Sequence, residues 1–320
     1  MARAGWEDHV GRRFKLRELY ILSSVVQWGS MAKAAAHLAM SQPAVSEAVA
    51  SLEATLQVRL LDRGPRGIEP TIYGQALLKR GTVVFDELRQ GIRDIEYLAD
   101  PATGEIRIGC PESLAAGFVP VMIDQFSRRH PQVTFQVVDA NIAALEFREL
   151  RERTVDLMLG RISKPFADDE INIHTLFDDR LFVVASTESR WARRRKIALA
   201  ELVDEPWILA PPNNLVRVLF VEAFHAHGLQ APRAKVTSNS INVRMHLLAS
   251  GRFLTFLAES LLRHNAKRWS LKALQVDLGI QQLPVAVATL RNRTLSPTVQ
   301  LFIEHIKAAT VGLCLAVFSR

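Results

Sequence analysis

A short polar turn at residues 41–43 constrains the fold of this 320-residue chain more than any other feature. Ser41 can accept a hydrogen bond from a free backbone N–H at a helix start, and Pro43 fits the first helical turn, where its missing N–H is not needed. Apolar residues then recur at helical spacing, at Val45, Val49, Leu52 and Leu56. Together with residues 29–40, this pattern predicts a helix-turn-helix.

The face of the second helix that lacks these apolar residues is small and polar. It carries Ser41, Gln42, Ala44, Ser46 and Glu47. Such a face suits a helix that enters the DNA major groove. Glu47 departs from that pattern because a carboxylate near phosphates repels them, unless it accepts from a cytosine amino group. Glu47 could equally face solvent or pair with a basic neighbour.

Two further segments extend this motif. Residues 13–28 keep a helical rhythm and predict a helix that packs under the motif. Residues 58–71 contain two short apolar runs around Gly-Pro-Arg-Gly, which predicts a hairpin, or wing. Arg63 and Arg66 in this wing could reach phosphates or a minor groove, or could be solvated turn residues.

Positive charge concentrates in the same region. Residues 12–80 contain ten Lys or Arg and five Asp or Glu, a net charge of +5, and the whole chain carries +7. This distribution favours an anionic partner for the N-terminal region. The basic run at residues 193–196 lies outside it and is interpreted as solvated.

Residues 71–99 predict one long helix with an apolar stripe. The stripe comprises Ala76, Leu77, Val83, Val84, Leu88, Ile92, Ile95 and Leu98. A helix attached to a small domain cannot bury such a stripe alone, so we expect a partner helix or packing on the rest of the chain. Residues 100–104 then mark a domain boundary.

The second half alternates short strands and helices, as in parallel sheets built from βαβ units. Strands are expected at residues 106–109, 133–138, 156–160, 181–185, 207–210, 235–237, 253–257 and 284–291. Helices are expected at residues 115–129, 142–153, 216–226, 242–250 and 296–309. Two smaller α/β lobes suit this length better than one large sheet.

Residues 16–78 resemble the N-terminal domain of the LysR-type transcriptional regulators. The matching positions are Ala34, Ala35, Leu38, Ser41, Gln42, Pro43, Ala44, Ser46, Leu52, Glu53, Leu60, Leu61, Arg63, Thr71 and Gly74. The resemblance places Ser41, Gln42, Pro43 and Ser46 at the DNA-facing start of the recognition helix. It also assigns Arg63 and Arg66 to the wing.

The resemblance implies a multidomain fold. A mainly α winged helix-turn-helix domain is expected at residues 12–72, and a linker helix for dimerisation at 73–99. An α/β effector-binding domain similar to periplasmic binding proteins is expected at 104–310. Its lobe I would comprise about 104–178 and 282–310, and its lobe II about 179–281. A homodimer or homotetramer would bind a palindrome in double-stranded DNA and, with RNA polymerase, regulate transcription.

A ligand in such a domain is expected between the lobes, beyond the carboxyl ends of the strands, where helix N-termini favour anions. Candidate contacts for a small organic anion are Ser113, Asn141, Asn213, Asn214, Ser238 and Ser240. Ser and Asn are also common helix caps and turn residues, so each could serve a purely structural role instead.

Other classes of function receive little support. The sequence contains no phosphate-binding glycine loop, GxSxG elbow or HExxH pair, so no catalytic residue, metal or cofactor is predicted. Cys110 and Cys314 form no CxxC motif. With no export signal or apolar stretch of membrane-spanning length recognised, a cytoplasmic location and no membrane partner are expected. The alternatives are a solute-binding protein with a helical appendage and a non-specific nucleoid protein.

Overall fold

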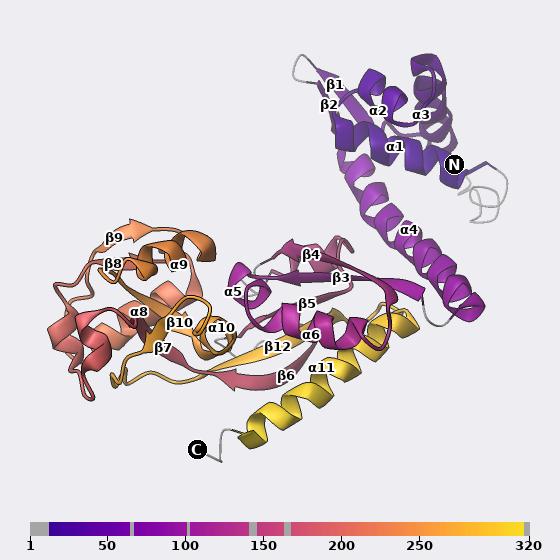
Figure 1. Ribbon diagram of the computed structural model, residues 1–320. Helices are drawn as coiled ribbons and strands as arrows, with labels where there is room; N and C mark the ends of the chain where they lie inside the picture. The colour runs from indigo at the N-terminus through magenta and orange to yellow at the C-terminus, as the bar shows by residue number, and fades with distance from the viewer. Residues whose placement is uncertain (1–12, 65–66, 101–102, 141–145, 163–167, 317–320) are drawn as a thin grey trace. The chain divides into compact units, whose positions relative to one another are not determined.

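The computed structural model describes residues 13–64, 67–100, 103–140, 146–162 and 168–316. The chain forms two compact units, Met1–Arg89 and Gln90–Arg320. Helix α4 (Ile72–Ala99) contributes its first turns to one unit and its last turns to the other (Figure 1).

The first unit is a winged helix-turn-helix. It contains α1 (Leu16–Trp28), α2 (Met31–His37), α3 (Gln42–Leu56) and the antiparallel pair β1 (Leu61–Gly64) and β2 (Gly67–Pro70). The Ser41 hydroxyl accepts from the Ala44 N–H at 3.3 Å, which confirms its predicted role as the N-cap of α3. Val45, Val49 and Leu52 are fully buried against α1 and α2, as their spacing predicts, whereas Leu56, the fourth residue of the predicted face, is half-buried.

The apolar residues of α1 are not all buried. Leu16 and Tyr20 are about half exposed, whereas Leu19, Leu22 and Val25 form the part of α1 in the core. The spacing of apolar residues alone did not separate the two faces. One edge of the Tyr20 ring packs against Phe85 of α4, so this side chain is partly covered although it lies outside the core.

Three residues join the end of α3 to the wing and to α4. The Glu53 carboxylate accepts from the N–H groups of Leu60 and Leu61 at 2.7 and 3.3 Å. The Thr71 hydroxyl donates to the Arg59 carbonyl at 2.7 Å and accepts from the Gly74 N–H at 3.1 Å. Gly74 packs directly against the backbone at Leu60, and an added Cβ would lie 2.1 Å from the Leu60 carbonyl oxygen.

The second unit contains two five-stranded sheets, which define lobe I and lobe II. The order in lobe I is β4-β3-β5-β12-β6, and in lobe II β11-β7-β10-β8-β9. Lobe I comprises β3 (Thr103–Cys110), β4 (Gln132–Asp139), β5 (Leu157–Arg161), β6 (Ile171–Asp179) and β12 (Leu283–Leu290). Lobe II comprises β7 (Leu181–Ser186), β8 (Trp207–Leu209), β9 (Ala234–Thr237), β10 (Leu254–Ala258) and β11 (Leu271–Ala273).

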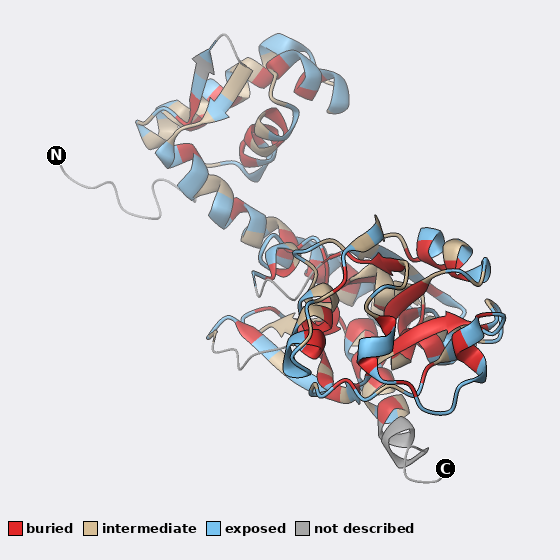
Figure 2. Ribbon diagram, turned by 90° about the vertical axis from the view of Figure 1, so that its left-hand side faces the viewer, coloured by how far each residue is buried: buried red, intermediate tan, exposed pale blue. Residues whose placement is uncertain are grey.

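Helices cover both sheets, so buried strands lie beneath helices with exposed outer faces (Figure 2). In lobe I, α6 (Phe118–Ser127) and α11 (Pro297–Ala316) pack on one face. The short helices α5 (Glu112–Ala115) and α7 (Arg148–Arg151) complete this lobe. In lobe II, α8 (Leu215–Ala226) packs on one face, with α9 (Ile241–Ala249) and α10 (Glu259–Asn265) on the other. Two 3-10 helices, Arg190–Arg193 and Leu199–Leu202, join the α8 side.

The α/β class is confirmed, but the sheets are mixed. β12 runs antiparallel to β5 and β6, and β7 runs antiparallel to β10 and β11. The expected strands omitted β6 and β11, and the expected helices omitted α10. β6 lies at a sheet edge and alternates irregularly between buried and exposed residues, so its sequence lacks a clear strand pattern.

Two expected helices are shorter than predicted. The helix expected at residues 115–129 is interrupted at Gly117, where an added Cβ would lie 2.8 Å from the Ser260 carbonyl oxygen. This close contact with α10 leaves no room for a side chain at residue 117, so glycine fits there. Of residues 142–153, only Arg148–Arg151 forms an α-helix, and residues 141–145 lie outside the described residues.

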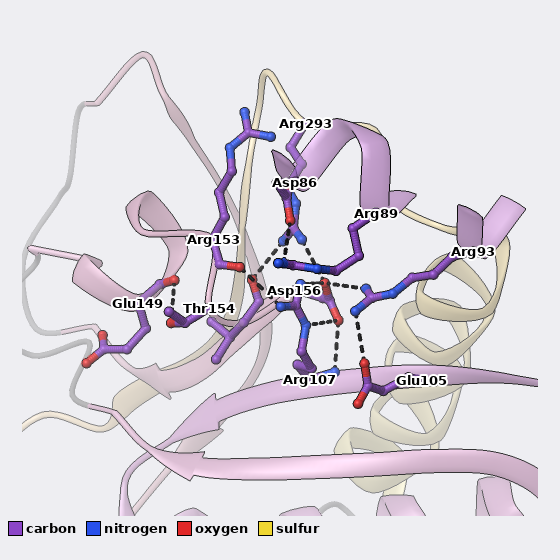
Figure 3. Close-up of polar contacts among 11 residues, drawn as sticks. Asp86, Arg89, Arg93, Glu105, Arg107, Glu149, Arg153, Thr154, Asp156 and Arg293 are labelled. Atoms are coloured by element: carbon purple, nitrogen blue, oxygen red, sulfur yellow. Dashed lines mark hydrogen bonds and ion pairs between the residues drawn. The ribbon is translucent and has the colours of Figure 1, made fainter. Parts of the chain in front are cut away.

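A buried carboxylate, Asp156, joins four separate segments of the second unit (Figure 3). Its oxygens accept from the guanidinium groups of Arg107 at 2.7 Å, Arg293 at 2.9 Å and Arg93 at 3.2 Å. It also accepts from the Arg107 backbone N–H at 2.9 Å. Arg93 bonds Glu105 as well, at 2.9 Å. These bonds attach the last turns of α4 to lobe I.

We predict that Gly74→Ala destabilises the first unit, because the new methyl group overlaps the Leu60 carbonyl and forces the start of α4 away from β1. The expected loss in the free energy of unfolding is about 1–3 kcal/mol, measured by urea denaturation. Gly64→Ala is the matched control, since nothing lies within 4 Å of its added Cβ. Equal stability of the two variants would contradict this packing argument.

We predict that Asp156→Asn lowers the free energy of unfolding of the second unit by about 3–5 kcal/mol, because it leaves buried guanidinium groups without their carboxylate. Glu105→Gln, whose side chain is 46% exposed, serves as the control and should change stability by about 1 kcal/mol or less. Chemical denaturation at pH 7 measures both changes.

The effect of Asp156→Asn should depend on pH. Burial opposes ionisation of Asp156, but bonds to Arg107 and the charges of Arg107 and Arg293 outweigh it and lower its pKa. A lowered folded-state pKa contributes stability above the unfolded carboxyl pKa of about 4, which is lost as the pH falls further. The difference between wild type and Asp156→Asn should therefore shrink on acidification below pH 4. A constant difference would show that the charge of Asp156 is not its source.

Candidate nucleic-acid interface and effector site

The start of α3 presents the residues predicted to face DNA. Ser41, Gln42, Pro43 and Glu47 are exposed, and Ala44 and Ser46 are half-buried. The apolar side of the same helix is held in the core, so its orientation within the first unit is set by packing. The described side chains offer Glu47 no hydrogen bond or ion pair in the structure, which agrees with a solvent-facing carboxylate.

The wing is anchored to the helix-turn-helix. The Ile68 N–H donates to the Gly29 carbonyl at 3.3 Å, which joins β2 to the turn between α1 and α2. Arg63 lies in β1 opposite Ile68. Arg66 lies outside the described residues. Two exposed basic residues that sequence reasoning did not assign, Lys33 on α2 and Arg59 before β1, add positive charge to this unit.

Ser113 lies where lobe I meets lobe II. Pro111, rather than Ser113, is the N-cap of α5, so the capping role considered for Ser113 is wrong. The Ser113 hydroxyl instead accepts from Arg161 Nη1 at 2.9 Å. Arg161 is the last residue of β5, which runs parallel to β3. The carboxyl ends of the two strands therefore lie at the same edge of the sheet, and this brings Ser113, just after β3, close to Arg161.

A buried network around Arg161 joins the two lobes. Its Nε and Nη2 atoms donate to Asp179 Oδ2 at 3.0 and 2.6 Å, and Nη2 also bonds the Ser260 hydroxyl at 3.1 Å. Ser260, at the start of α10, donates from its backbone N–H to Asp179 Oδ1 at 2.9 Å. Asn265 of the same helix donates to the Ala116 carbonyl at 2.8 Å. α10 is therefore a lobe II element bonded directly to lobe I.

The remaining candidate residues line one edge of lobe II. β8 and β9 are parallel, so their carboxyl ends meet there. Asn214 caps α8 by accepting from the Val216 N–H at 2.9 Å, and Asn213 is exposed beside it. Ser240 caps α9, and the Ser238 hydroxyl accepts from the Ser240 N–H at 3.1 Å. Each bonded side chain thus has a structural role, and Asn141 lies outside the described residues.

Two further charged residues at this edge were missed by sequence reasoning. Glu112 Oε1 accepts from the Ile241 N–H at 2.8 Å, a bond from lobe I to the first turn of α9 in lobe II. Arg244, one turn later, is 5% exposed and donates to Thr255 and to the Phe256 carbonyl. Burial lowers the pKa of Arg244 to about 10, and the charge of Glu112 acts in the opposite direction. Glu112 could have been considered from the sequence, because it is adjacent to the predicted Ser113.

The described residues show no cluster of three or more His, Cys, Asp or Glu suited to a metal ion. The described helices are all too short or too polar to cross a membrane. Cys110 is buried, and burial, with a smaller contribution from Asp139, raises the pKa of its thiol to about 12. A thiol with such a pKa stays protonated and unreactive near neutral pH.

Comparison with known proteins matches both parts of the chain. Residues 16–75 match the bacterial regulatory helix-turn-helix protein family of lysR type, and residues 99–310 match the LysR substrate binding domain. The HTH-type transcriptional regulator GbpR of Azospirillum brasilense is 26% identical over 93% of this chain and 87% of its own length.

Solved structures show the same fold. The LysR family transcriptional regulator CbnR has a TM-score of 0.66 at 18% identity, covering 93% of this chain and 99% of that one. Full-length CbnR complexed with its target DNA has a TM-score of 0.53 at 21% identity, covering 93% and 100%. With a winged helix-turn-helix unit, a two-lobed α/β unit and family matches over both, this chain belongs to the LysR family of bacterial transcriptional regulators.

Proposed function

We propose that this protein is a ligand-responsive regulator that binds specific double-stranded DNA through the start of α3 and the wing. The observation that carries this proposal is the exposed polar first turn of α3, capped by Ser41 and oriented by a buried face behind it. The related regulator CbnR, whose structure is known in complex with target DNA, supports the same mode of binding here.

Each residue predicted to face DNA has a distinct role in this proposal. Gln42 and Ser46 reach base edges in the major groove, while Pro43 and Ala44 allow the helix to approach closely. Arg63 and Arg66 contact phosphates or a minor groove beside the helix. Glu47 faces solvent or accepts from a cytosine amino group.

The protein functions as a homodimer or homotetramer through α4. This helix leaves a row of large apolar side chains exposed: Val84, Leu88, Ile92, Ile95 and Leu98, between 40% and 79%. Exposed apolar residues at helical spacing favour burial against a second helix. A symmetric pairing of two copies presents two recognition helices to a palindromic site.

The effector is a small organic anion bound between the lobes, near Ser113, Asn141, Asn213, Asn214, Ser238 and Ser240. Arg161 and Arg244 place two buried guanidinium groups near this edge, and the first turn of α9 presents backbone N–H groups and the positive end of the helix dipole, which supports an anionic ligand. Effector binding changes the arrangement of the dimer through its different affinity for two states. The regulator acts in the cytoplasm, where it influences RNA polymerase.

We predict that Gln42→Ala weakens binding to the specific operator by about 5- to 150-fold, which corresponds to the loss of one base contact of 1–3 kcal/mol. Binding to unrelated DNA should change little, since phosphate contacts remain. Gel-shift titration at constant salt measures both. Gln75→Ala, the same change at an exposed position on α4, is the control. Equal loss on both DNA sequences would contradict a role in base recognition.

We predict that Ile92→Asp shifts the protein toward smaller oligomers, because a carboxylate in the paired apolar face is costly to desolvate. Ile92 is 58% exposed in the single chain, so its own fold should be retained. Leu301→Asp on α11, where Leu301 is 44% exposed, is the matched control. Analytical ultracentrifugation distinguishes them: an unchanged oligomer in Ile92→Asp would rule out pairing through this face.

A further inference from the structure

The first turn of α9 already holds a carboxylate that belongs to the protein. The Glu112 carboxylate accepts a hydrogen bond from the Ile241 N–H at 2.8 Å, and the Ser240 hydroxyl accepts one from the Val243 N–H at 3.4 Å. Free N–H groups and the helix dipole favour an anion at such a position. Glu112 therefore occupies the place at which α9 would bind an external anion.

Arg244 provides a second and independent sign of an anion site here. Arg244 is only 5% exposed. Its Nη2 atom donates to the Thr255 hydroxyl at 3.1 Å and to the Phe256 carbonyl at 2.7 Å. Within the described part of the chain, its buried Nε has no hydrogen-bond acceptor. Burying a guanidinium group is costly unless a negative charge lies near it, and the charge of Glu112 acts on Arg244 in this stabilising sense.

Glu112 also carries the negative charge that acts on Arg244. Arg161 is paired with Asp179, whereas Arg244 has no ion pair among the described residues and its charged form is favoured by Glu112. An added anion beside Glu112 would leave two like charges at one helix end, which is unfavourable in a partly buried site. An anionic ligand therefore requires Glu112 to leave.

We propose that Glu112 is a tethered competitor of the effector: its carboxylate occupies the anion position at the first turn of α9, and an effector carboxylate binds there by displacing it. This inference rests on the proposed effector site between the lobes. It also makes Glu112 a determinant of specificity, because uncharged molecules cannot replace its charge beside Arg244.

Displacement has a structural consequence. The bond from Glu112 to Ile241 joins lobe I to lobe II, so an effector that takes its place removes one interlobe bond. Competition by Glu112 also has an energetic consequence. The apparent affinity for the effector is proportional to the fraction of molecules in which the site is free. A side chain that occupies the site about 90% of the time weakens effector binding about tenfold.

The test uses acetate as the probe and thermal unfolding of the full chain at constant ionic strength. A ligand that binds the folded state raises its melting temperature. Glu112→Gln keeps the shape of the side chain but removes its charge, and should bind acetate about tenfold more tightly than wild type. Glu222→Gln, at an exposed position on α8, is the matched control and should behave as wild type. Acetamide, the uncharged analogue, should stabilise none of the three proteins.

Two contrary results can be told apart. Equal stabilisation of wild type and Glu112→Gln by acetate would overturn competition by Glu112 but leave the proposed anion site intact. If acetate stabilises neither protein, the anion site itself is contradicted, and the competition with it. Stabilisation of Glu222→Gln as strong as that of Glu112→Gln would show a general charge effect and would also overturn the inference.

Discussion

The second unit depends on one buried carboxylate. Asp156 bonds guanidinium groups from β3, from the segment before α11 and from the last turns of α4. Removing such a charge from water is costly, and only close bonds with good geometry offset that cost. The last turns of α4 thus share one electrostatic network with the lobe I sheet. Any rearrangement of lobe I that disturbs Asp156 acts directly on the helix proposed to pair two subunits.

Much of the fold could be predicted from local patterns. Ser41 and Pro43 identified the start of α3, and the spacing of Val45, Val49 and Leu52 identified its buried face, because capping and amphipathicity are properties of short segments. β6 and α10 were missed since their positions depend on contacts with distant strands and with lobe I. The antiparallel pairing of β12 likewise has no local signature.

The candidate sites, like the fold, could be predicted from the sequence only where they depend on local patterns. The polar set at the start of α3 follows from its sequence once the helix is known, whereas the hydrogen bond between Ser113 and Arg161 does not. The bond of Glu112 to Ile241 joins residues 129 positions apart, and Arg161 reaches Ser260 across 99. Such contacts arise from the packing of two lobes and leave no periodic signal in the chain. The contacts that Glu112 and Arg161 make between the lobes could therefore not be predicted from the sequence, although Glu112 is adjacent to the predicted Ser113.

The proposed regulator binds a specific DNA site as a symmetric oligomer. The most direct measurement is DNase footprinting of the full chain, near physiological salt, on the DNA surrounding its own gene. Sequence-specific binding predicts protection of discrete half-sites separated by about one helical turn, or a multiple of it. Uniform, salt-sensitive coverage without preferred positions, or loss of all binding at that salt, would contradict the claim.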